Sequence, residues 1–435
     1  MRRFLPLAVI AMLCLMGCVE GLAQSQEKTA MSQAAVQRVR VVCVGDSITD
    51  GNTYPLILMQ ALADADKPVP AAVCAGVASD TAALMAARFD PFLEMKPDIV
   101  TFSAGTNDAS RGVAPADYEK ALREIAEKCK ANKITMILLT PCAINVGDTN
   151  KPNEKAEAIG EEYAEIIRTV AKEYGWPVAE VSALQKAARK KGETIMSPDG
   201  IHPDYHGQSL MARAILDAMG HKDVPVPTAK EFKPQPLPGM ATLWFVQAAP
   251  TEKKNDKDVP RQWSDDELAE QTRMLTALFG GGDINGRIAW HSYTFPEKQK
   301  ANKDGKFVDA GDWKEQLRRN GFAIHINDLV EGRLRYWGTV VPSDGAKKAF
   351  VNTALGAQRV WLNGKLIYTH PKDSGGNEIW TGYHAGKERI AVTLAKGPNT
   401  LVIEHNNNEF FMSVTDKLVW EEDYAAELEK AAKKK

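Results

Sequence analysis

The sequence predicts an α/β domain built on a parallel sheet, followed by an all-β sandwich domain. Two regularities in the 435-residue chain indicate this order. Residues 38–222 alternate short, continuous apolar runs with helix-like segments, and such runs are typical of parallel strands that are covered on both faces. After about residue 240 the segments become short, aromatic and often alternating, as in antiparallel sandwiches.

Five strands, each followed by helical sequence, are expected in residues 38–222. The strand-like runs are 39–45, 70–76, 97–105, 134–142 and 176–184. The helix-like segments are 55–65, 80–95, 116–133, 153–175, a short basic helix after residue 184, and 205–220. Because sites in parallel sheets lie beyond the carboxyl ends of the strands, Ser47, Ser79 and Asn107 are well placed for chemistry.

A proline-rich stretch, residues 223–239, separates the two patterns. Its prolines predict a semi-rigid linker, since proline at that density suits neither a helix nor a central strand. Residues 240–420 are then expected to form a β-sandwich with one helical insert at 264–280. The Asn363-Gly364 pair suits a two-residue hairpin turn. The charged end, residues 421–435, is predicted to be a solvated helical tail.

The first 23 residues have the pattern of an export signal. Two arginines precede an apolar run from Phe4 to Leu15, which is too short to span a membrane. Two interpretations of where the export signal ends stay open. "LMGC" resembles a bacterial lipobox that would place a lipid on Cys18, and "GLA" suits ordinary cleavage after Ala23. Both predict an exported protein, either a cell-envelope lipoprotein or a secreted protein, with residues 24–37 as a flexible tether. A lipid at this position is the only membrane attachment that we expect.

Composition excludes some classes of partner. The chain is 44% apolar and 25% charged, and its formal net charge of -2 gives no reason to expect nucleic acid binding. The four cysteines beyond the export signal are irregularly spaced, without a C-x-x-C pair or a Cys/His cluster, so we expect no metal site and no cofactor. Export permits disulfides, but buried free thiols are the favoured interpretation for these cysteines: Cys43, Cys74, Cys129 and Cys142.

Ser47 raises the question of a nucleophile. It follows the first expected strand in "VVCVGDSITDGNTYP", yet Gly-Asp-Ser is also an ordinary turn sequence. A serine nucleophile needs a base, an acid that orients the base, and donors for the oxyanion. "SPDGIHPDYHG" supplies Asp199 and His202 at a spacing that lets the carboxylate reach the imidazole across one turn. His206 is interpreted as a surface or helix-capping residue.

A third block, "FSAGTNDAS", follows the strongly apolar strand at 97–105. It places Asn107, a short amide donor, at a tight glycine turn. Asn and Asp also suit turns and helix caps, so a purely structural interpretation of this block stays open.

Taken in order, G-D-S-I-T, G-T-N-D and D-G-I-H-P resemble the SGNH hydrolases, also called GDSL-type esterases, over about residues 38–220. The resemblance implies a three-layer, flavodoxin-like fold. It also implies that Ser47 is the nucleophile and that Asp199 and His202 complete the catalytic triad.

The same resemblance implies an oxyanion hole made by the backbone N–H groups of Ser47 and Ser79 and the side chain of Asn107. One block departs from the family's pattern. The usual G-x-x-G-D-T reads "GVASDT" here, so Ser79 replaces the second glycine. A backbone donor survives this change, but the added Cβ opposes a positive φ and narrows the pocket.

The later blocks W-L-N-G-K and L-A-K-G-P-N-T-L resemble the galactose-binding-like jelly rolls of bacterial carbohydrate-active enzymes, over about residues 330–420. Many such domains only pack against a catalytic partner. The candidates for stacking on a sugar ring are Trp361, Trp380, Tyr383 and His384, for which the alternative is an ordinary place in the sandwich core.

The leading functional interpretation is an exported serine ester hydrolase that removes acetyl groups from a carbohydrate, or acts on another small ester, through an acyl-enzyme. A lipase, lysophospholipase or thioesterase of the same family is an alternative, which a large apolar lid would favour; no such segment lies between the blocks. A cell-surface carbohydrate-binding protein with a degenerate hydrolase domain is another alternative, which Ser79 supports and the intact triad opposes. The sugar, the acyl position and the oligomeric state stay open.

Overall fold

The computed structural model describes most of the chain from residue 38 onward. The described residues are 38–233, 235, 238–239, 243–279, 291–294, 324–325, 334–354, 356–372, 386–406, 409–410 and 412–434. The predicted export signal and tether lie outside these residues. Among the helices of the described part, none combines the length and the apolar character that a membrane crossing needs.

The α/β domain is built on a five-stranded sheet with the strand order β2-β1-β3-β4-β5, and every neighbouring pair is parallel. This is the flavodoxin-like order. The strands are β1 (Arg40–Gly45), β2 (Ala71–Gly76), β3 (Ile99–Ser103), β4 (Thr135–Leu139) and β5 (Val178–Ala179). The helices are α2 (Ser47–Asp50), α3 (Thr53–Asp64), α4 (Ala82–Ala87), α5 (Asp90–Leu93), α6 (Thr106–Arg111), α7 (Pro115–Ala131), α8 (Glu154–Tyr174), α9 (Val181–Lys190) and α10 (Tyr205–Ala218).

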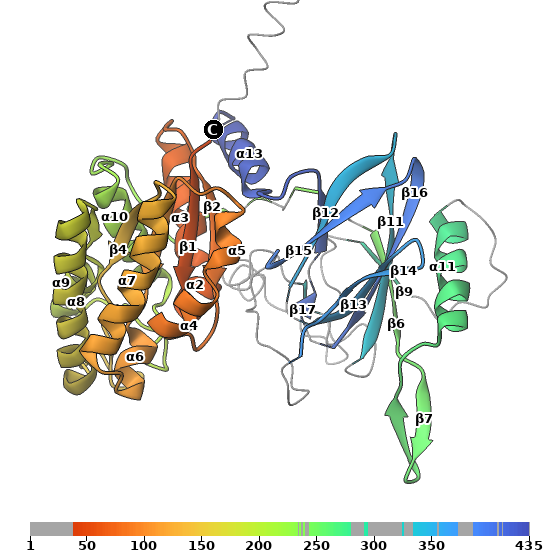
Figure 1. Cartoon of the computed structure of the whole chain (residues 1–435), viewed down its shortest axis with the longest axis horizontal. Helices are drawn as coiled ribbons and strands as arrows, with labels where there is room; N and C mark the ends of the chain where they lie inside the picture. Colours follow the sequence, from red (N-terminus) through yellow and green to blue (C-terminus); the bar gives the residue numbers. More distant parts are fainter. Residues whose placement is uncertain are drawn as a thin grey trace, which may run out of the picture. The chain divides into compact units, whose positions relative to one another are not determined.

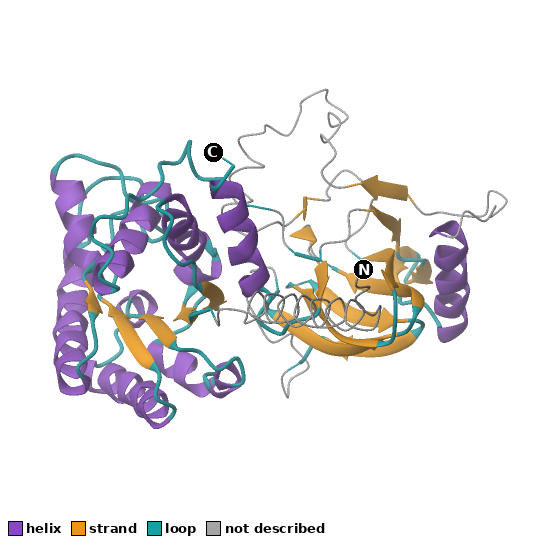
Figure 2. Cartoon of the chain, turned by 90° about the horizontal axis from the view of Figure 1, so that it is seen from above, coloured by secondary structure: helices purple, strands orange, loops and turns teal. Residues whose placement is uncertain are grey.

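Side-chain alternation along β1 produces two cores, one on each face of the sheet. Val41 and Cys43 join a cluster with α3 and α10, whereas Val42 and Val44 join a cluster with α4, α7 and α8. The strands therefore lie between helices on both sides, which is visible where orange strands are surrounded by purple helices in Figure 2. This three-layer arrangement confirms the predicted fold class.

The helix boundaries follow local sequence signals. The side chain of Asn153 caps the start of α8 by accepting the Ala156 N–H, and Gly175 ends the helix at φ 69°. One prediction is wrong: the segment 80–95 is not one helix, because α4 ends at Ala87 and the short α5, with Pro91 in its first turn, follows.

The second half of the chain is an antiparallel β-rich region, as predicted. One sheet has the order β14-β13-β16-β11-β6-β9 and another has the order β15-β12-β18. Its strands are β6 (Leu243–Ala248), β7 (Thr251–Lys254), β8 (Lys257–Pro260), β9 (His291–Thr294), β10 (Ile324–His325), β11 (Arg335–Ser343), β12 (Lys347–Thr353), β13 (Ala357–Leu362), β14 (Lys365–Thr369), β15 (Glu388–Leu394), β16 (Gly397–His405), β17 (Glu409–Phe410) and β18 (Met412–Thr415).

The two larger sheets of this region share a core. Trp244 and Trp337 from the six-stranded sheet join Val351 and Met412 from the three-stranded sheet in one buried cluster. The predicted hairpin is confirmed: Leu362 pairs with Lys365 across a turn whose two residues have positive φ. The predicted helical insert is α11 (Asp265–Phe279), which packs on the six-stranded sheet through Leu275 (Figure 1).

The chain end differs from its prediction as a solvated tail. Helix α13 (Glu421–Ala432) packs on the α/β domain beside α3 (Figure 1). Tyr424, Ala425 and Leu428 lie in the same core as the inner face of α3. The periodic apolar positions of "YAAELEKAA" therefore form a buried face. Charged residues beside this face also contact the α/β domain: Glu422 pairs with Arg40, and Glu429 accepts the Val69 N–H.

The predicted linker also has contacts that a free linker would lack. In its described part, Val224 and Phe232 are buried in the α3 core. Gln60 of α3 clamps the backbone there: its Nε2 donates to the Glu231 carbonyl at 2.8 Å, and its Oε1 accepts the Lys233 N–H at 2.8 Å. This stretch is therefore part of the α/β core's covering, and the exact domain boundary stays a prediction.

Candidate active site

Ser47 begins α2 immediately beyond the carboxyl end of β1. Asp46 caps this helix, since its Oδ1 accepts the Ile48 N–H at 2.9 Å. The helix lies so close to β2 that a Cβ on Gly76 would come within 2.2 Å of the Asp50 nitrogen. Glycine is required at that strand end because the backbone of the Ser47 helix occupies the space of a side chain.

The structure brings Ser47, His202 and Asp199 into one hydrogen-bonded chain. The distance from Ser47 Oγ to His202 Nε2 is 2.8 Å, and the distance from His202 Nδ1 to Asp199 Oδ2 is 2.7 Å. These residues are far apart in sequence and meet because α2 and the loop before α10 lie at the same edge of the sheet. This is the geometry that nucleophilic catalysis by serine requires.

The Asp199 loop is held by its own carboxylate. Asp199 Oδ1 accepts the N–H groups of Ile201 and His202, both at 2.9 Å. Partial burial alone would raise the pKa of Asp199, but these backbone N–H groups and the His202 ring outweigh it and lower the pKa. Asp199 therefore stays ionised and can fix the orientation of the imidazole.

Ser79 adopts the backbone conformation that its Cβ was expected to oppose. Its φ is +69°, and its side chain is exposed beyond the end of β2. The turn before it is fixed by the Val77 N–H, which donates to the Gly45 carbonyl at 3.0 Å. The structure therefore accepts serine at a position that favours glycine, at the cost of local strain.

Asn107 lies between the Ser47 and Ser79 segments. Its Nδ2 donates to the Asp80 carbonyl at 3.0 Å and to Asp46 Oδ2 at 3.3 Å. The turn before it requires glycine, since Gly105 has φ +115° and a Cβ there would lie 2.7 Å from Pro141 Cγ. All the predicted site residues are thus at the carboxyl edge of the sheet, although their catalytic roles stay predictions.

Buried carboxylates around these residues were missed by the sequence reasoning. Burial raises the pKa of Asp46 to about 7, against the lowering effects of the Ile48 N–H and of nearby His202. Burial also raises the pKa of Asp108, which accepts the Ala82 and Gly105 N–H groups. The available signal was an aspartate beside each singled-out residue, since Asp46 directly precedes Ser47 and Asp108 directly follows Asn107.

Asp80 has a cationic partner. The distance from Arg88 Nε to Asp80 Oδ2 is 2.5 Å, and Arg88 Nη2 donates to the Gly45 carbonyl at 3.0 Å. Burial raises the pKa of Asp80, although Arg88 acts in the opposite direction. Arg88 therefore ties the end of β1 to the segment that follows Ser79.

Other sequence candidates have ordinary places in the structure. The imidazole of His206 contacts Glu193 at 2.8 Å on the surface, as interpreted from the sequence. Trp361 is 5% exposed and belongs to a core cluster, so it does not offer a face to a sugar. The remaining aromatic candidates lie outside the described residues: Trp380, Tyr383 and His384. Cys43, Cys74, Cys129 and Cys142 are buried free thiols, as favoured.

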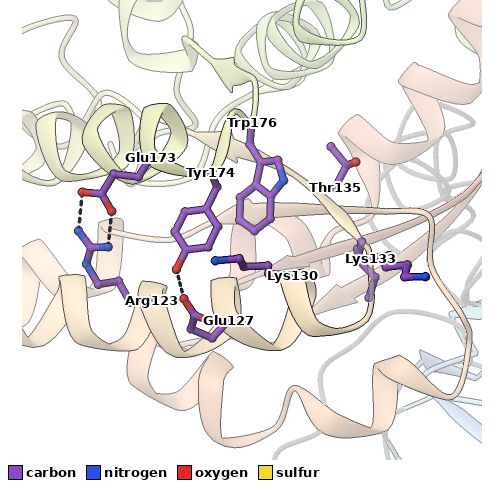
Figure 3. Close-up of a pocket in the computed structure, with 9 residues that line it drawn as sticks. Arg123, Glu127, Lys130, Lys133, Thr135, Glu173, Tyr174 and Trp176 are labelled. Atoms are coloured by element: carbon purple, nitrogen blue, oxygen red, sulfur yellow. Dashed lines mark hydrogen bonds and ion pairs between the residues drawn. The ribbon is translucent and has the colours of Figure 1, made fainter.

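A pocket of about 660 Å³ lies at the opposite end of the sheet. It borders Thr135, where β4 begins, and Trp176, which precedes β5. Figure 3 shows Arg123 facing Glu173, and the Tyr174 hydroxyl donating a hydrogen bond to Glu127. None of the predicted site residues lines this pocket. Over the residues that the structure describes, no group of three or more His, Cys, Asp and Glu side chains is arranged to hold a metal ion.

Comparison with known proteins places this domain in a family. The model of the GDSL-like Lipase/Acylhydrolase family matches residues 43–210, which include the nucleophile block and the Asp199 loop. Esterase TesA of Pseudomonas aeruginosa is 31% identical over 187 residues, which cover 40% of this chain and 84% of TesA. The acetylxylan esterase of Xylanibacter ruminicola is 28% identical over 219 residues, 42% of this chain and 43% of that enzyme.

Two solved structures are similar to part of the chain. LAE5, described as an alpha/beta hydrolase enzyme from the metagenome of Lake Arreo, is 25% identical, with a TM-score of 0.39 over 42% of this chain and 96% of its own. Axe2, an acetylxylan esterase from Geobacillus stearothermophilus, is 22% identical, with a TM-score of 0.38 over 42% of this chain and 94% of its own. On the family model and the similarity to TesA, the chain belongs to the GDSL-like lipase/acylhydrolase family and is a carboxylic ester hydrolase.

Proposed function

We propose that this protein is a serine esterase that removes acetyl groups from a carbohydrate, with Ser47, His202 and Asp199 as its catalytic triad. The observation that carries the proposal is the continuous hydrogen-bonded chain from Ser47 Oγ through the imidazole to the Asp199 carboxylate, with links of 2.8 Å and 2.7 Å. Each role in the triad matches an atom already in place.

The proposed reaction has two halves. His202 Nε2 takes the proton from Ser47 Oγ as that oxygen attacks the ester carbonyl, and a tetrahedral oxyanion forms. When the intermediate collapses, the C–O bond to the alcohol breaks and the imidazolium returns its proton to the leaving oxygen. Water then attacks the acyl-enzyme in the same way, which releases the carboxylic acid and restores Ser47. Asp199 holds the Nδ1–H of the ring throughout.

Three donors surround the proposed position of the oxyanion. These are the backbone N–H groups of Ser47 and Ser79 and the Nδ2 group of Asn107. Both Asn107 protons have acceptors in the free enzyme, and the contact with Asp46 is the longer of the two at 3.3 Å. In the proposal, one of these protons turns to the oxyanion as negative charge develops there.

The acetyl and carbohydrate parts of the proposal are supported by two observations that do not involve the triad. A relative that is 28% identical is named an acetylxylan esterase. The β-rich region, proposed as a galactose-binding-like domain, is the other support for a sugar substrate. Export, either as a lipoprotein or by secretion, is likewise proposed from the N-terminal sequence alone.

A fluorophosphonate probe tests the nucleophile directly. We expect a single covalent label on Ser47 by mass mapping, and loss of both label and 4-nitrophenyl acetate turnover in Ser47→Ala. Label on another serine, or none on active protein, contradicts the triad. Ser110→Ala, which changes an exposed serine of the neighbouring α6, is the matched control and is expected to behave like the wild type.

Substrate comparisons test the acyl group and the sugar. We expect acetyl esters to be preferred over octanoyl esters, and acetate to be released from at least one acetylated polysaccharide or oligosaccharide. A preference for octanoyl esters favours the lipase or thioesterase interpretation. Sugar binding without any ester turnover favours a carbohydrate-binding protein.

A further inference from the structure

A lysine from the β-rich region is buried at the edge of the esterase site. Lys387 directly precedes β15, and its side chain is 9% exposed. Its Nζ donates a hydrogen bond to the Gly76 carbonyl and lies 4.0 Å from Asp50 Oδ1. A buried ammonium group requires acceptors of this kind, because burial without them is strongly unfavourable.

The two contacts of Lys387 lie on the two segments that frame the site. Gly76 is the last residue of β2, and the chain from it leads through Val77 to the positive-φ turn at Ser79. Asp50 is the last residue of α2, the helix that Ser47 begins. The ammonium group thus bridges the nucleophile helix and the strand end that carries the second backbone donor.

Several charged or titratable groups face this lysine. Burial lowers the pKa of Lys387, whereas Cys74, Asp50 and Asp80 act to raise it and Arg88 acts to lower it further. All four belong to the α/β domain, so the environment of the lysine is set by the domain that holds the triad.

A second cation, Arg389 of β15, lies two residues further along the chain and provides a contrast. Arg389 makes a bidentate ion pair with Glu421 and donates to the Leu418 carbonyl, and it is 5% exposed. These partners join β15 to the start of α13 and include no residue of β2 or α2. Arg389 therefore joins two elements of the second half of the chain, whereas Lys387 contacts β2 and α2 of the α/β domain.

We propose that Lys387 is a positioning residue for the esterase site: its ammonium group holds the Gly76 carbonyl and the Asp50 carboxylate, and thereby sets the Ser79 N–H relative to Ser47 Oγ. The proposal rests on the function proposed above, since the Ser79 N–H matters only if an oxyanion forms beside it. It makes the β-rich region a part of the esterase rather than a detachable module.

Truncation with chemical rescue tests the proposal in the full-length protein. Lys387→Ala is expected to lower kcat for 4-nitrophenyl acetate by about 10- to 100-fold with little change in KM, because small displacements of catalytic donors lower the rate without weakening substrate binding. The missing atoms correspond to n-propylammonium, which is expected to restore part of kcat with saturation. Tetramethylammonium, which lacks an N–H donor, is expected to restore nothing. Lys396→Ala, at an exposed lysine of the same region, is the matched control.

Amide hydrogen exchange supplies a readout that does not depend on turnover. In Lys387→Ala, the amides of residues 77–80 are expected to exchange faster, and propylammonium is expected to slow them again. If kcat and this exchange are unchanged in the variant, or if kcat falls without any rescue by propylammonium, Lys387 has no positioning role. An active wild type whose Ser47→Ala variant is inert, combined with an unaffected Lys387→Ala, overturns this inference alone. A wild type that hydrolyses no ester overturns both proposals.

Discussion

The edge strand β15 of the β-rich region is buried in a different way from β1 and β2 of the α/β domain. β1 and β2 are buried along almost their entire length, whereas only Leu394, at its last position, is buried in β15. The first pattern arises because helices cover both faces of a parallel sheet, and the second because antiparallel sheets can leave one face to solvent. Polar residues lie beyond the carboxyl edge of the parallel sheet, and the residues of the proposed triad are among them.

The cores of the two regions are less separate than their strands. Tyr424 and Leu428, at the end of the chain, are buried with α3 of the α/β domain, while the tryptophan-rich cluster of the sandwich contains only its own strands. Lys387 reaches the same domain near its site. The comparison teaches that the proposed catalytic residues all lie in the α/β domain, whereas the residues that pack around this domain come from both regions.

Among the substitutions that test this difference between the two regions, Asn107→Ala is expected to have the largest effect. Removal of one oxyanion donor typically lowers kcat by about 10²–10³-fold. We expect that reduction for Asn107→Ala in 4-nitrophenyl acetate hydrolysis, with KM nearly unchanged and the fold intact by circular dichroism. Asn132→Ala, the same substitution at the exposed asparagine that follows α7, serves as the control. A harmless Asn107→Ala together with an inactive Ser79→Ala would mean that the Ser79 hydroxyl is the donor, and the oxyanion would then lie nearer the end of β2.

A substitution in the C-terminal helix α13 tests whether this helix contributes to the stability of the α/β domain. Leu428 of α13 is 4% exposed and packs in the α3 core. Leu428→Ala is expected to lower the free energy of unfolding by about 2–5 kcal/mol, because it removes buried apolar atoms and leaves a cavity. Chemical denaturation followed by circular dichroism measures this loss. Leu366→Ala, at a residue that is 47% exposed, is expected to cost less than about 0.5 kcal/mol. Equal effects would restore the interpretation of a solvated tail.

The buried carboxylate of Asp46 predicts a pH-dependent stability. Its pKa is raised to about 7 in the folded protein, against about 3.9 for aspartate in an unfolded chain. The folded state therefore binds this proton more tightly, so the stabilisation is present at low pH and is lost as pH rises through about 7. Between about pH 5.5 and about pH 8 this group should lower the free energy of unfolding by about 2 kcal/mol.

Asp46→Asn cannot titrate and is expected to lack that pH-dependent loss. Denaturant unfolding of the variant and the wild type at both pH values measures the difference. Asp66→Asn, at an exposed aspartate, is the control and should follow the wild type. Parallel pH profiles for all three proteins would show that the folded-state pKa of Asp46 does not lie near 7.

The smallest expected effect belongs to Ser79. Since φ at this position is +69°, Ser79→Gly should relieve strain and stabilise the fold by about 1 kcal/mol or less, with kcat equal or slightly higher. Ser79→Ala keeps the backbone N–H and should change kcat by less than about twofold. Thermal unfolding and steady-state kinetics of both variants measure these effects. A clear destabilisation by glycine would show that the serine side chain supports the turn.

Much of the α/β domain could be predicted from the sequence, because its strands, helices and motifs each depend on residues close together in the chain. The apolar runs predicted the five strands, but the last run, 176–184, was too long: β5 is only Val178–Ala179, and α9 already begins at Val181. The short motifs located Ser47, Asn107, Asp199 and His202. The hairpin at Asn363-Gly364 could be predicted in the same way, because both turn residues have positive φ and Asn-Gly is a favoured pair for such a turn. In each case the feature depends on a few adjacent residues and on the alternation of strands and helices.

By itself, the amino-acid sequence determined the order of the elements, the parallel and antiparallel character of the two halves, and the residues that the family resemblance selects for a triad. The tertiary structure alone decided how far apart those residues lie, that Ser79 accepts a positive φ, that α13 is buried, and that Lys387 reaches the end of β2. The physical reason is that burial and long-range contacts depend on which surfaces meet. A lysine or a charged helix has the same local pattern in solvent and against a partner, and only packing distinguishes the two.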